Sequence, residues 1–226
     1  MSEVPQVAAS SLPWLTVDQM AEADRVAIEE FGIGLLQMME HAGSALAELV
    51  GIVAPEGAVT VLAGGGNNGG GGLCAARHLH DRGRDVEVVL ATDVPGPAPA
   101  HHLRTLAATG IEPRPEPFDR PVVVDALVGY GLDGPLRGRA AELAEWTAGR
   151  RVVSLDFPSG YGHPGGIAAE ATLTLALPKE GLRGVRPLYL ADLGLPPELW
   201  SWPTLGLAVG PVFAAGRIVE ITTASL

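Results

Sequence analysis

The sequence predicts an α/β fold built on a mostly parallel β-sheet. Short β-rich runs alternate with helical stretches, several runs are apolar enough to be covered on both faces, and a glycine-rich turn joins one run to the following helix. Alternation of this kind pairs strands in parallel through right-handed crossovers. A length of 226 residues is long for one domain but favours one over two, so residues 1–226 are expected to form a single domain.

Two helices are expected before the sheet. Thr16 and Gln19 fit a capping box, apolar residues follow at spacings of three, four and seven, and Gly32 suits the end of that helix. A broad apolar stripe predicts a second helix over 35–50. Residues 1–12 are expected to be flexible.

The strands and helices of the sheet region follow in alternation. Strands are predicted at Val59–Ala63, Val86–Leu90, Val122–Ala126, Val152–Leu155, Ala171–Ala176 and Leu188–Ala191. Helices are predicted near Leu73–Arg82, Ala100–Ala108 and Arg139–Ala148. The Pro- and Trp-bearing segment 197–226 shows no usable periodicity, so its structure is left open.

Composition excludes several classes of function. A net charge of −11 argues against nucleic acid as a partner, and no apolar run reaches the roughly 20 residues of a membrane span. The N-terminal residues lack the pattern of a signal peptide. The single cysteine, Cys74, rules out an intramolecular disulfide and is expected to be a small core residue, and the histidines are expected to be solvated. A cytoplasmic location is therefore expected.

The strongest local signal is the glycine-asparagine segment Gly64–Gly72, directly after one strand and before one helix. Its glycines allow a ligand to approach the backbone, and the helix N-terminus offers free N–H groups to an anion. Gly64, Gly66 and Gly69 also satisfy G-x-G-x-x-G, which alone is a weak sign of a dinucleotide-binding dehydrogenase. The acidic residue expected about 20 positions later has no well-placed match.

Two carboxylates follow predicted strands. Asp125 ends the strand at 122–126, and Asp156 follows the strand at 152–155. In an open α/β sheet the carboxyl ends of the strands face the ligand, so both residues are expected in one pocket with the glycine segment. Either aspartate alone could be a helix cap instead.

The motifs together resemble the NAD(P)H-hydrate epimerase family, also known as the YjeF N-terminal domain. The matching pieces occur in family order, from the entry helices to about Pro196. They are Met39-Glu40-His41-Ala42-Gly43, Gly66-Asn67-Asn68-Gly69-Gly70, Val124-Asp125-Ala126, Gly131-Leu132 with Pro135-Leu136-Arg137-Gly138, Asp156-Phe157-Pro158-Ser159-Gly160, Pro178-Lys179-Glu180-Gly181-Leu182 and Asp192-Leu193-Gly194-Leu195-Pro196.

The resemblance implies a Rossmann-like three-layer α/β/α sandwich, a homodimer, and inversion at C6 of hydrated NAD(P)H, a nucleotide-like small molecule that is the substrate rather than a cofactor. It implies that Asp125 is the catalytic acid/base and that Asn68, Asp125 and Ser159 hold a potassium ion. The substrate-binding residues that it implies are Asn67, Asn68, Gly69, Gly70, Gly71, Gly129, Tyr130, Gly131, Leu132 and Asp156.

The sequence departs from the family pattern around this pocket. Gly71 stands where the family has Asp, Tyr130 stands where Thr or Ser is usual, and the segment after Gly160 lacks a familiar acidic residue. Two alternatives to the epimerase therefore stay open: a repurposed enzyme acting on a different small molecule, and a non-catalytic binding or dimerisation module.

Lys179 is the one lysine among 15 basic residues. Its place in a Pro-Lys-x-Gly turn predicts a compact cation that arginine cannot replace, set against a carbonyl cluster or Asp156. The competing interpretation is a solvated side chain retained by chance.

Overall fold

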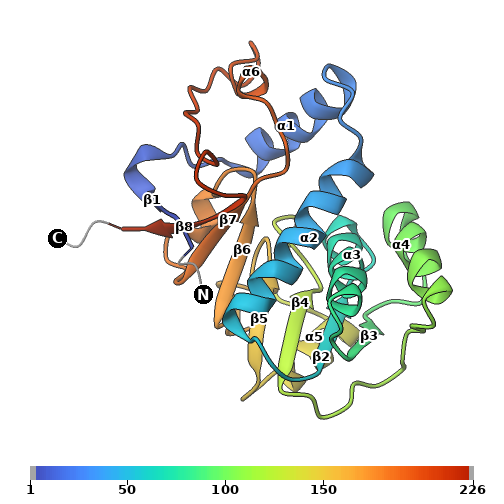
Figure 1. The fold of residues 1–226 in the computed structure, drawn as a ribbon. Helices are drawn as coiled ribbons and strands as arrows, with labels where there is room; N and C mark the ends of the chain where they lie inside the picture. Colours follow the sequence, from blue (N-terminus) through green and yellow to red (C-terminus); the bar gives the residue numbers. More distant parts are fainter. Residues whose placement is uncertain (1–3, 224–226) are drawn as a thin grey trace.

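A computed structural model describes residues 4–223 and confirms the mostly parallel α/β class. Within these residues, eight strands form one sheet in the order β1-β8-β7-β6-β5-β4-β2-β3, in which only the β7–β8 pair is antiparallel (Figure 1). The strands are β1 (Gln6–Ala8), β2 (Val59–Ala63), β3 (Val86–Leu90), β4 (Val122–Ala126), β5 (Arg151–Leu155), β6 (Ala171–Leu175), β7 (Leu188–Ala191) and β8 (Ile218–Thr222).

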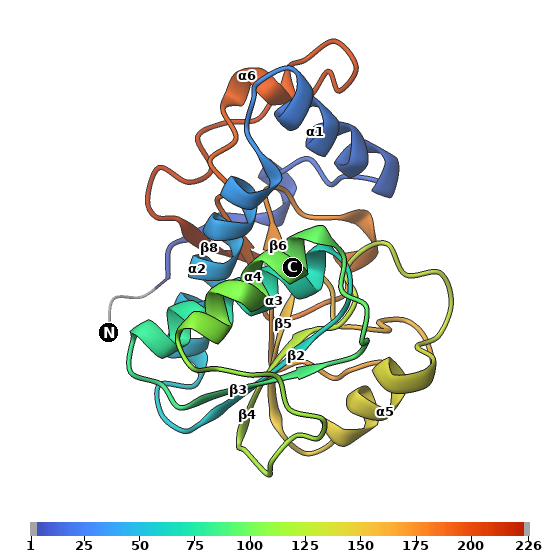
Figure 2. The same cartoon turned by 90° about the vertical axis from the view of Figure 1, so that its right-hand side faces the viewer.

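Helices cover both faces of this sheet and make a three-layer sandwich. Helices α2, α3 and α4 lie on one face and α5 lies on the other (Figure 2). The α-helices are α1 (Val17–Glu29), α2 (Leu35–Val53), α3 (Asn67–Asp81), α4 (Pro97–Ala108), α5 (Gly138–Trp146) and α6 (Pro197–Trp200).

Strand pleating divides the core between the two faces. Val61 and Val124 join the core beneath α2 and α3, whereas their neighbours Leu62 and Val123 join the core beneath α5. Both faces are covered, which explains why the central strands are mostly apolar on both faces; the polar residues Thr60 and Ser154 within them are themselves buried.

The entry helices agree with the sequence prediction. Thr16 accepts from the Gln19 backbone N–H while the Gln19 side chain accepts from the Thr16 N–H, so the capping box is formed. Gly32, just beyond α1, has a φ of +66° that suits the turn into α2. Within residues 4–223, even the 19-residue α2 does not make a helix long and apolar enough to span a membrane.

Two local predictions are wrong, and one segment left open by the sequence has regular structure. Residues 4–12 are ordered, because β1 pairs with β8 and Leu12 packs in the core beside them; residues 1–3 lie outside the described part of the chain. The segment after 196, whose structure the sequence left open, contains α6 and β8. Helix α3 begins at Asn67, inside the glycine-rich segment.

The sheet order places a crevice where the functional motifs meet. Strand β2 has β3 on one side and β4 on the other, because the chain runs from β2 outward to β3 and then crosses back over β2 to β4. Ligands of open α/β sheets bind at the carboxyl ends of strands beside such a reversal. Helices α1 and α6 pack together over this end of the sheet (Figure 1).

Candidate active site

A cavity of about 460 Å³ lies at the carboxyl ends of the strands, beneath α1 and α2. Its polar lining comes from the start of α3, the loop after β4, Asp156 and Lys179. Its apolar lining includes Met20, Leu35, Met38, Met39, Leu127 and Leu193. A largely apolar cleft with a few convergent polar groups is typical of a small-molecule site.

The N-terminus of α3 opens into this cavity. Gly65, Gly66, Asn67 and Asn68 all line it, and the first intrahelical backbone bond runs from the Gly70 N–H to the Gly66 carbonyl. The preceding backbone N–H groups of the first turn have no helical acceptor, and the helix dipole adds partial positive charge there. This end of the 15-residue α3 can therefore receive a phosphate group.

Several glycines of the segment serve packing rather than ligand approach. A Cβ on Gly69 would lie 1.9 Å from the Gly64 carbonyl oxygen, and a Cβ on Gly72 would lie 2.4 Å from the Ala126 Cβ. Both distances are far below van der Waals contact, so only glycine lets α3 lie this close to β2 and β4. The prediction from sequence attributed these glycines to a ligand and missed this reason.

Gly71 does line the cavity, and an added Cβ there would lie 2.7 Å from Leu155 Cδ2. We expect Gly71→Asp, the residue of the family pattern, to destabilise the fold by about 1–3 kcal/mol because the buried Leu155 side chain must move. Urea unfolding measures this cost. Any gain in turnover is expected only when Leu155→Ala makes room.

The matched control is Gly131→Asp, which adds a carboxylate to the same cavity at a position where the new Cβ meets nothing within 4 Å. A loss of stability as large in Gly131→Asp as in Gly71→Asp would contradict the steric explanation and indicate charge as the cause.

Asp156 and Lys179 form a buried ion pair in the cavity wall. Their side chains are 5% and 2% exposed, and Lys179 Nζ lies 2.7 Å from Asp156 Oδ1. The ammonium also donates to the Thr174 hydroxyl (3.2 Å) and the Leu175 carbonyl (2.8 Å). These three acceptors use all three protons, so the solvated interpretation of Lys179 is wrong. Asp156 has a φ of +64°, an unusual backbone state for a residue with a side chain.

Asp125 lies beneath the cavity rather than in its lining. It is fully buried, and its two oxygens accept four hydrogen bonds: from Ser154 Oγ (2.7 Å), Ser159 N (2.8 Å), Ser159 Oγ (2.6 Å) and Leu127 N (3.2 Å). Burial raises the pKa of Asp125, and these hydrogen bonds oppose that rise. The arrangement links the ends of β4 and β5.

The predicted site residues divide into two groups by position. Those that line the cavity are Asn67, Asn68, Gly71, Gly129, Tyr130, Gly131 and Asp156. Gly69, Gly70, Leu132, Asp125 and Ser159 lie outside its lining. The sheet topology thus brings together motifs that are about 90 residues apart in the chain, as the strand-end argument predicts.

Asp24 of α1 is a cavity residue that the prediction from sequence missed. It lines the cavity, and its Oδ2 accepts a hydrogen bond from the Tyr130 hydroxyl at 3.2 Å. Burial raises the pKa of Asp24, with the Tyr130 hydrogen bond and the Lys179 charge acting in the opposite direction. A usable signal was its spacing: a carboxylate four residues after the buried Met20 falls on the apolar stripe of α1.

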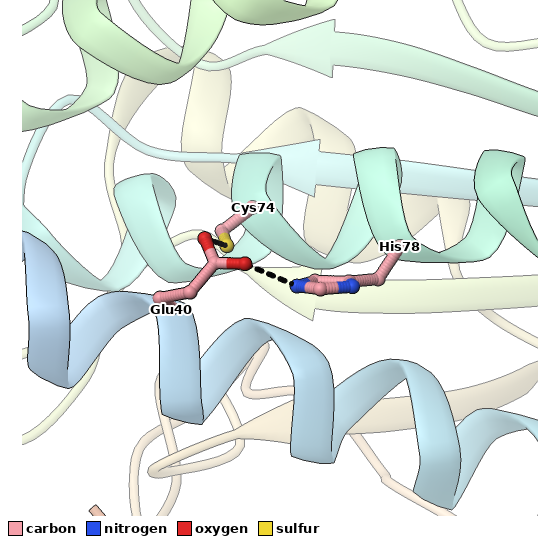
Figure 3. A group of neighbouring side chains, drawn as sticks. All are labelled: Glu40, Cys74 and His78. Atoms are coloured by element: carbon pink, nitrogen blue, oxygen red, sulfur yellow. Dashed lines mark hydrogen bonds and ion pairs between the residues drawn. The ribbon is translucent and has the colours of Figure 1, made fainter.

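A second polar cluster joins α2 to α3. Figure 3 shows Glu40 of α2 facing Cys74 and His78, which lie one turn apart on α3. Glu40 lies 3.2 Å from the Cys74 sulfur and 2.8 Å from His78 Nε2. All three donor atoms lie within 4.8 Å of one another, as the ligands of a metal ion do.

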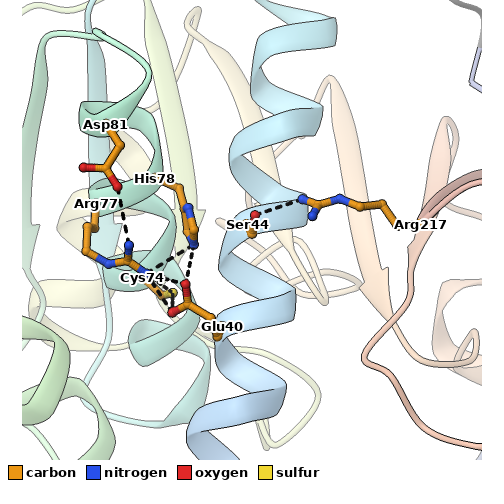
Figure 4. A network of polar contacts seen from close by, with 7 residues as sticks. All are labelled: Glu40, Ser44, Cys74, Arg77, His78, Asp81 and Arg217. Atoms are coloured by element: carbon orange, nitrogen blue, oxygen red, sulfur yellow. Dashed lines mark hydrogen bonds and ion pairs between the residues drawn. The ribbon is translucent and has the colours of Figure 1, made fainter.

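Arg77 already supplies a cation to this cluster. Its guanidinium lies 2.5 and 2.7 Å from the two Glu40 oxygens and 3.2 Å from His78 Nε2 (Figure 4). Burial and the Glu40 charge raise the pKa of Cys74 to about 12, so its thiol stays protonated near neutral pH. We therefore interpret the cluster as an ion-pair network that stabilises the contact between α2 and α3.

The predictions for cysteine and histidine side chains differ in outcome. Cys74 is fully buried, as expected of a core residue, and the Gly43 backbone packs against it. The expectation of solvated histidines is wrong for His102 of α4, which is 5% exposed, and for the partly buried His78. Figure 4 also shows Arg217, which donates to Ser44 and ties the C-terminal segment to α2.

The fold and the cavity define an α/β sandwich with a small-molecule site at the carboxyl edge of its sheet. The family described as YjeF-related protein N-terminus matches residues 35–181, and the chain belongs to that family. This confirms the resemblance that the motifs carried.

Curated relatives extend the match over nearly the whole chain. A protein of Dehalogenimonas lykanthroporepellens named NAD(P)H-hydrate epimerase is 42% identical, covering 92% of each chain. A protein of Rhodopirellula baltica with the same name is 35% identical, covering 83% of this chain and 87% of its own. The crystal structure of the yeast protein ynu0 has a TM-score of 0.79 at 23% identity, covering 93% of this chain and all of its own, and supports the fold.

Proposed function

We propose that this protein is an NAD(P)H-hydrate epimerase, an isomerase that interconverts the C6 epimers of hydrated NAD(P)H. The observation that carries the proposal is the 42% identity, over 92% of both chains, to a protein of that name. The cavity supports it with a phosphate-receiving helix end and titratable groups in one site. The two alternatives, a repurposed enzyme and a non-catalytic module, are less favoured because both of these relatives share this one name.

In this proposal the substrate phosphates bind at the start of α3 and the hydrated ring lies toward Asp156 and Tyr130. The free N–H groups at 67–69 favour the anionic end, whereas the apolar and carboxyl-bearing wall suits the ring. The proposed binding set is that of the family resemblance: Asn67, Asn68, Gly69, Gly70, Gly71, Gly129, Tyr130, Gly131, Leu132 and Asp156. Hydrated NAD(P)H is the substrate, and no redox cofactor is required for an epimerisation.

Potassium is part of the proposal, held by Asn68, Asp125 and Ser159. The donor types fit: Asp125 and Ser159 present side-chain oxygens 2.6 Å apart, and Asn68 can supply its side-chain amide oxygen. Oxygen donors with a carboxylate suit a hard cation. A bound potassium ion would supply positive charge at the cavity floor.

The burial of Asp125 changes the role that we propose for it. The resemblance makes Asp125 the acid/base, but its four hydrogen bonds and its place below the lining favour a positioning role, holding Ser159 and the cation. We further propose one domain, since one sheet contains strands from both ends of the described chain. A homodimer and a cytoplasmic location rest on the resemblance and the composition.

A coupled assay tests the function. A stereospecific dehydratase consumes one epimer of hydrated NADH quickly. The reaction then proceeds only as fast as the other epimer inverts without catalysis. We expect this protein to remove that slow phase in proportion to its concentration. The assay follows NADH absorbance, with heat-unfolded protein as the control. An unchanged slow phase with folded protein would reject the epimerase and favour the alternatives.

A further inference from the structure

Asp24 and Asp156 are joined across the cavity by one residue. The Tyr130 backbone N–H donates to Asp156 Oδ2 at 3.2 Å, and the Tyr130 hydroxyl donates to Asp24 Oδ2 at 3.2 Å. All three residues line the cavity. The aromatic Tyr130, which departs from the family pattern, therefore reaches from the strand-end loop to α1.

The two carboxylates have different surroundings. Asp156 is paired with the Lys179 ammonium at 2.7 Å, whereas Asp24 has one neutral hydroxyl donor and no ion-pair partner among the described residues. Burial raises the pKa of Asp24. An enzyme site that places two carboxyl groups in contrasting environments can keep one of them protonated, as an acid, and the other charged.

Other charged groups around Asp24 are already engaged or point to solvent. Lys179 and Asp156 act on it electrostatically from the sheet side. Its neighbour on α1, Arg25, pairs with acidic residues of the same region, and Glu198 on the packed helix α6 is exposed. Asp24 is thus the carboxyl group on the α1 wall that is available to a ligand.

We propose that Asp24 is a catalytic residue that exchanges a proton with the ring hydroxyl of the substrate. This inference rests on the proposed epimerase function and adds a proton-transfer residue to it. Asp24 delivers the proton from the α1 wall, and Tyr130 orients its carboxyl group.

The step balances with one carboxyl group and water. Protonated Asp24 gives its proton to the C6 hydroxyl, the C6–O bond breaks, and its electron pair leaves with the water. The lone pair on N1 forms the N1=C6 double bond. Water then adds to the opposite face of C6, the double-bond pair returns to N1, the released proton passes to solvent water, and Asp24 regains a proton from solvent.

Asp24→Asn tests the proposal because the amide oxygen can still accept from Tyr130 while the side chain no longer titrates. We expect kcat to fall by about 100-fold or more with KM within about threefold, which is the usual size of a general acid contribution. Asp18→Asn, an exposed aspartate on the same helix, is the matched control and should retain full activity.

The pH profile separates catalysis from structure. The wild-type rate should fall as pH rises through the pKa of Asp24, because the protonated form is the active one. This falling limb of the pH–rate profile should be absent in Asp24→Asn. Tyr130→Phe removes a hydrogen bond that lowers the pKa of Asp24, so its limb should move to higher pH.

Each outcome decides the matter. An active wild type with a comparably active Asp24→Asn variant would overturn the role of Asp24 and leave the epimerase intact. A wild type that does not accelerate inversion would overturn both. If Asp24→Asn does not fold, the Tyr130→Phe profile decides, and an unmoved limb would overturn the proposal.

Discussion

Lys179→Met is expected to lower the free energy of unfolding by about 3–5 kcal/mol, because it leaves the Asp156 carboxylate buried without its cation. It also removes the donor to the Thr174 hydroxyl and the Leu175 carbonyl. Turnover should be lost with it, since Asp156 lines the cavity. Urea unfolding and circular dichroism measure the stability change.

Two further variants identify the cause. Lys179→Met combined with Asp156→Asn should recover part of the lost stability, because no charge then remains unpaired. Lys179→Arg should still destabilise, since a planar guanidinium does not fit a site where a compact ammonium meets three acceptors. Arg183→Lys, an exposed change four residues away, is the control. If Lys179→Arg and Arg183→Lys were equally stable, that result would contradict the interpretation that the Lys179 site accepts only a compact ammonium.

Asp125→Asn is expected to abolish turnover and also to destabilise the fold. Each Asp125 oxygen accepts one backbone N–H, from Leu127 or from Ser159. Either orientation of the amide therefore sets its NH₂ group against a backbone donor that cannot turn away. A buried donor without its acceptor costs about 1–3 kcal/mol. The variant is thus not the clean test of acid/base chemistry that its size suggests.

The measurement is thermal unfolding in KCl and in choline chloride at equal ionic strength. Wild-type protein should gain stability in KCl, and Asp125→Asn should lose most of that gain. Ser154→Ala is the control, because it removes one hydroxyl donor to Asp125 and leaves the proposed cation ligands in place. A KCl response retained in Asp125→Asn would contradict its role as a ligand.

The order of elements could be read from local pattern. Val59–Ala63 and Val122–Ala126 are mostly apolar because both faces of the sheet are covered, and the Thr16 capping box needs only its own first turn. The ends of the chain could not be read in this way. Strand β1 is three residues long and exists because β8, more than 200 residues away, supplies its partner.

The site residues likewise divide into those that the sequence could predict and those that only the tertiary structure placed. Motif spacing determined that Asn67, Asn68 and Asp156 would meet at one sheet edge, because strand ends in a parallel sheet share an edge. Only the tertiary structure decided that Asp125 lies beneath the cavity and that Asp24 of α1 lines it. The reason is physical: a side chain's burial and partners depend on what packs over it, and α1 is placed there by contacts that local sequence does not encode.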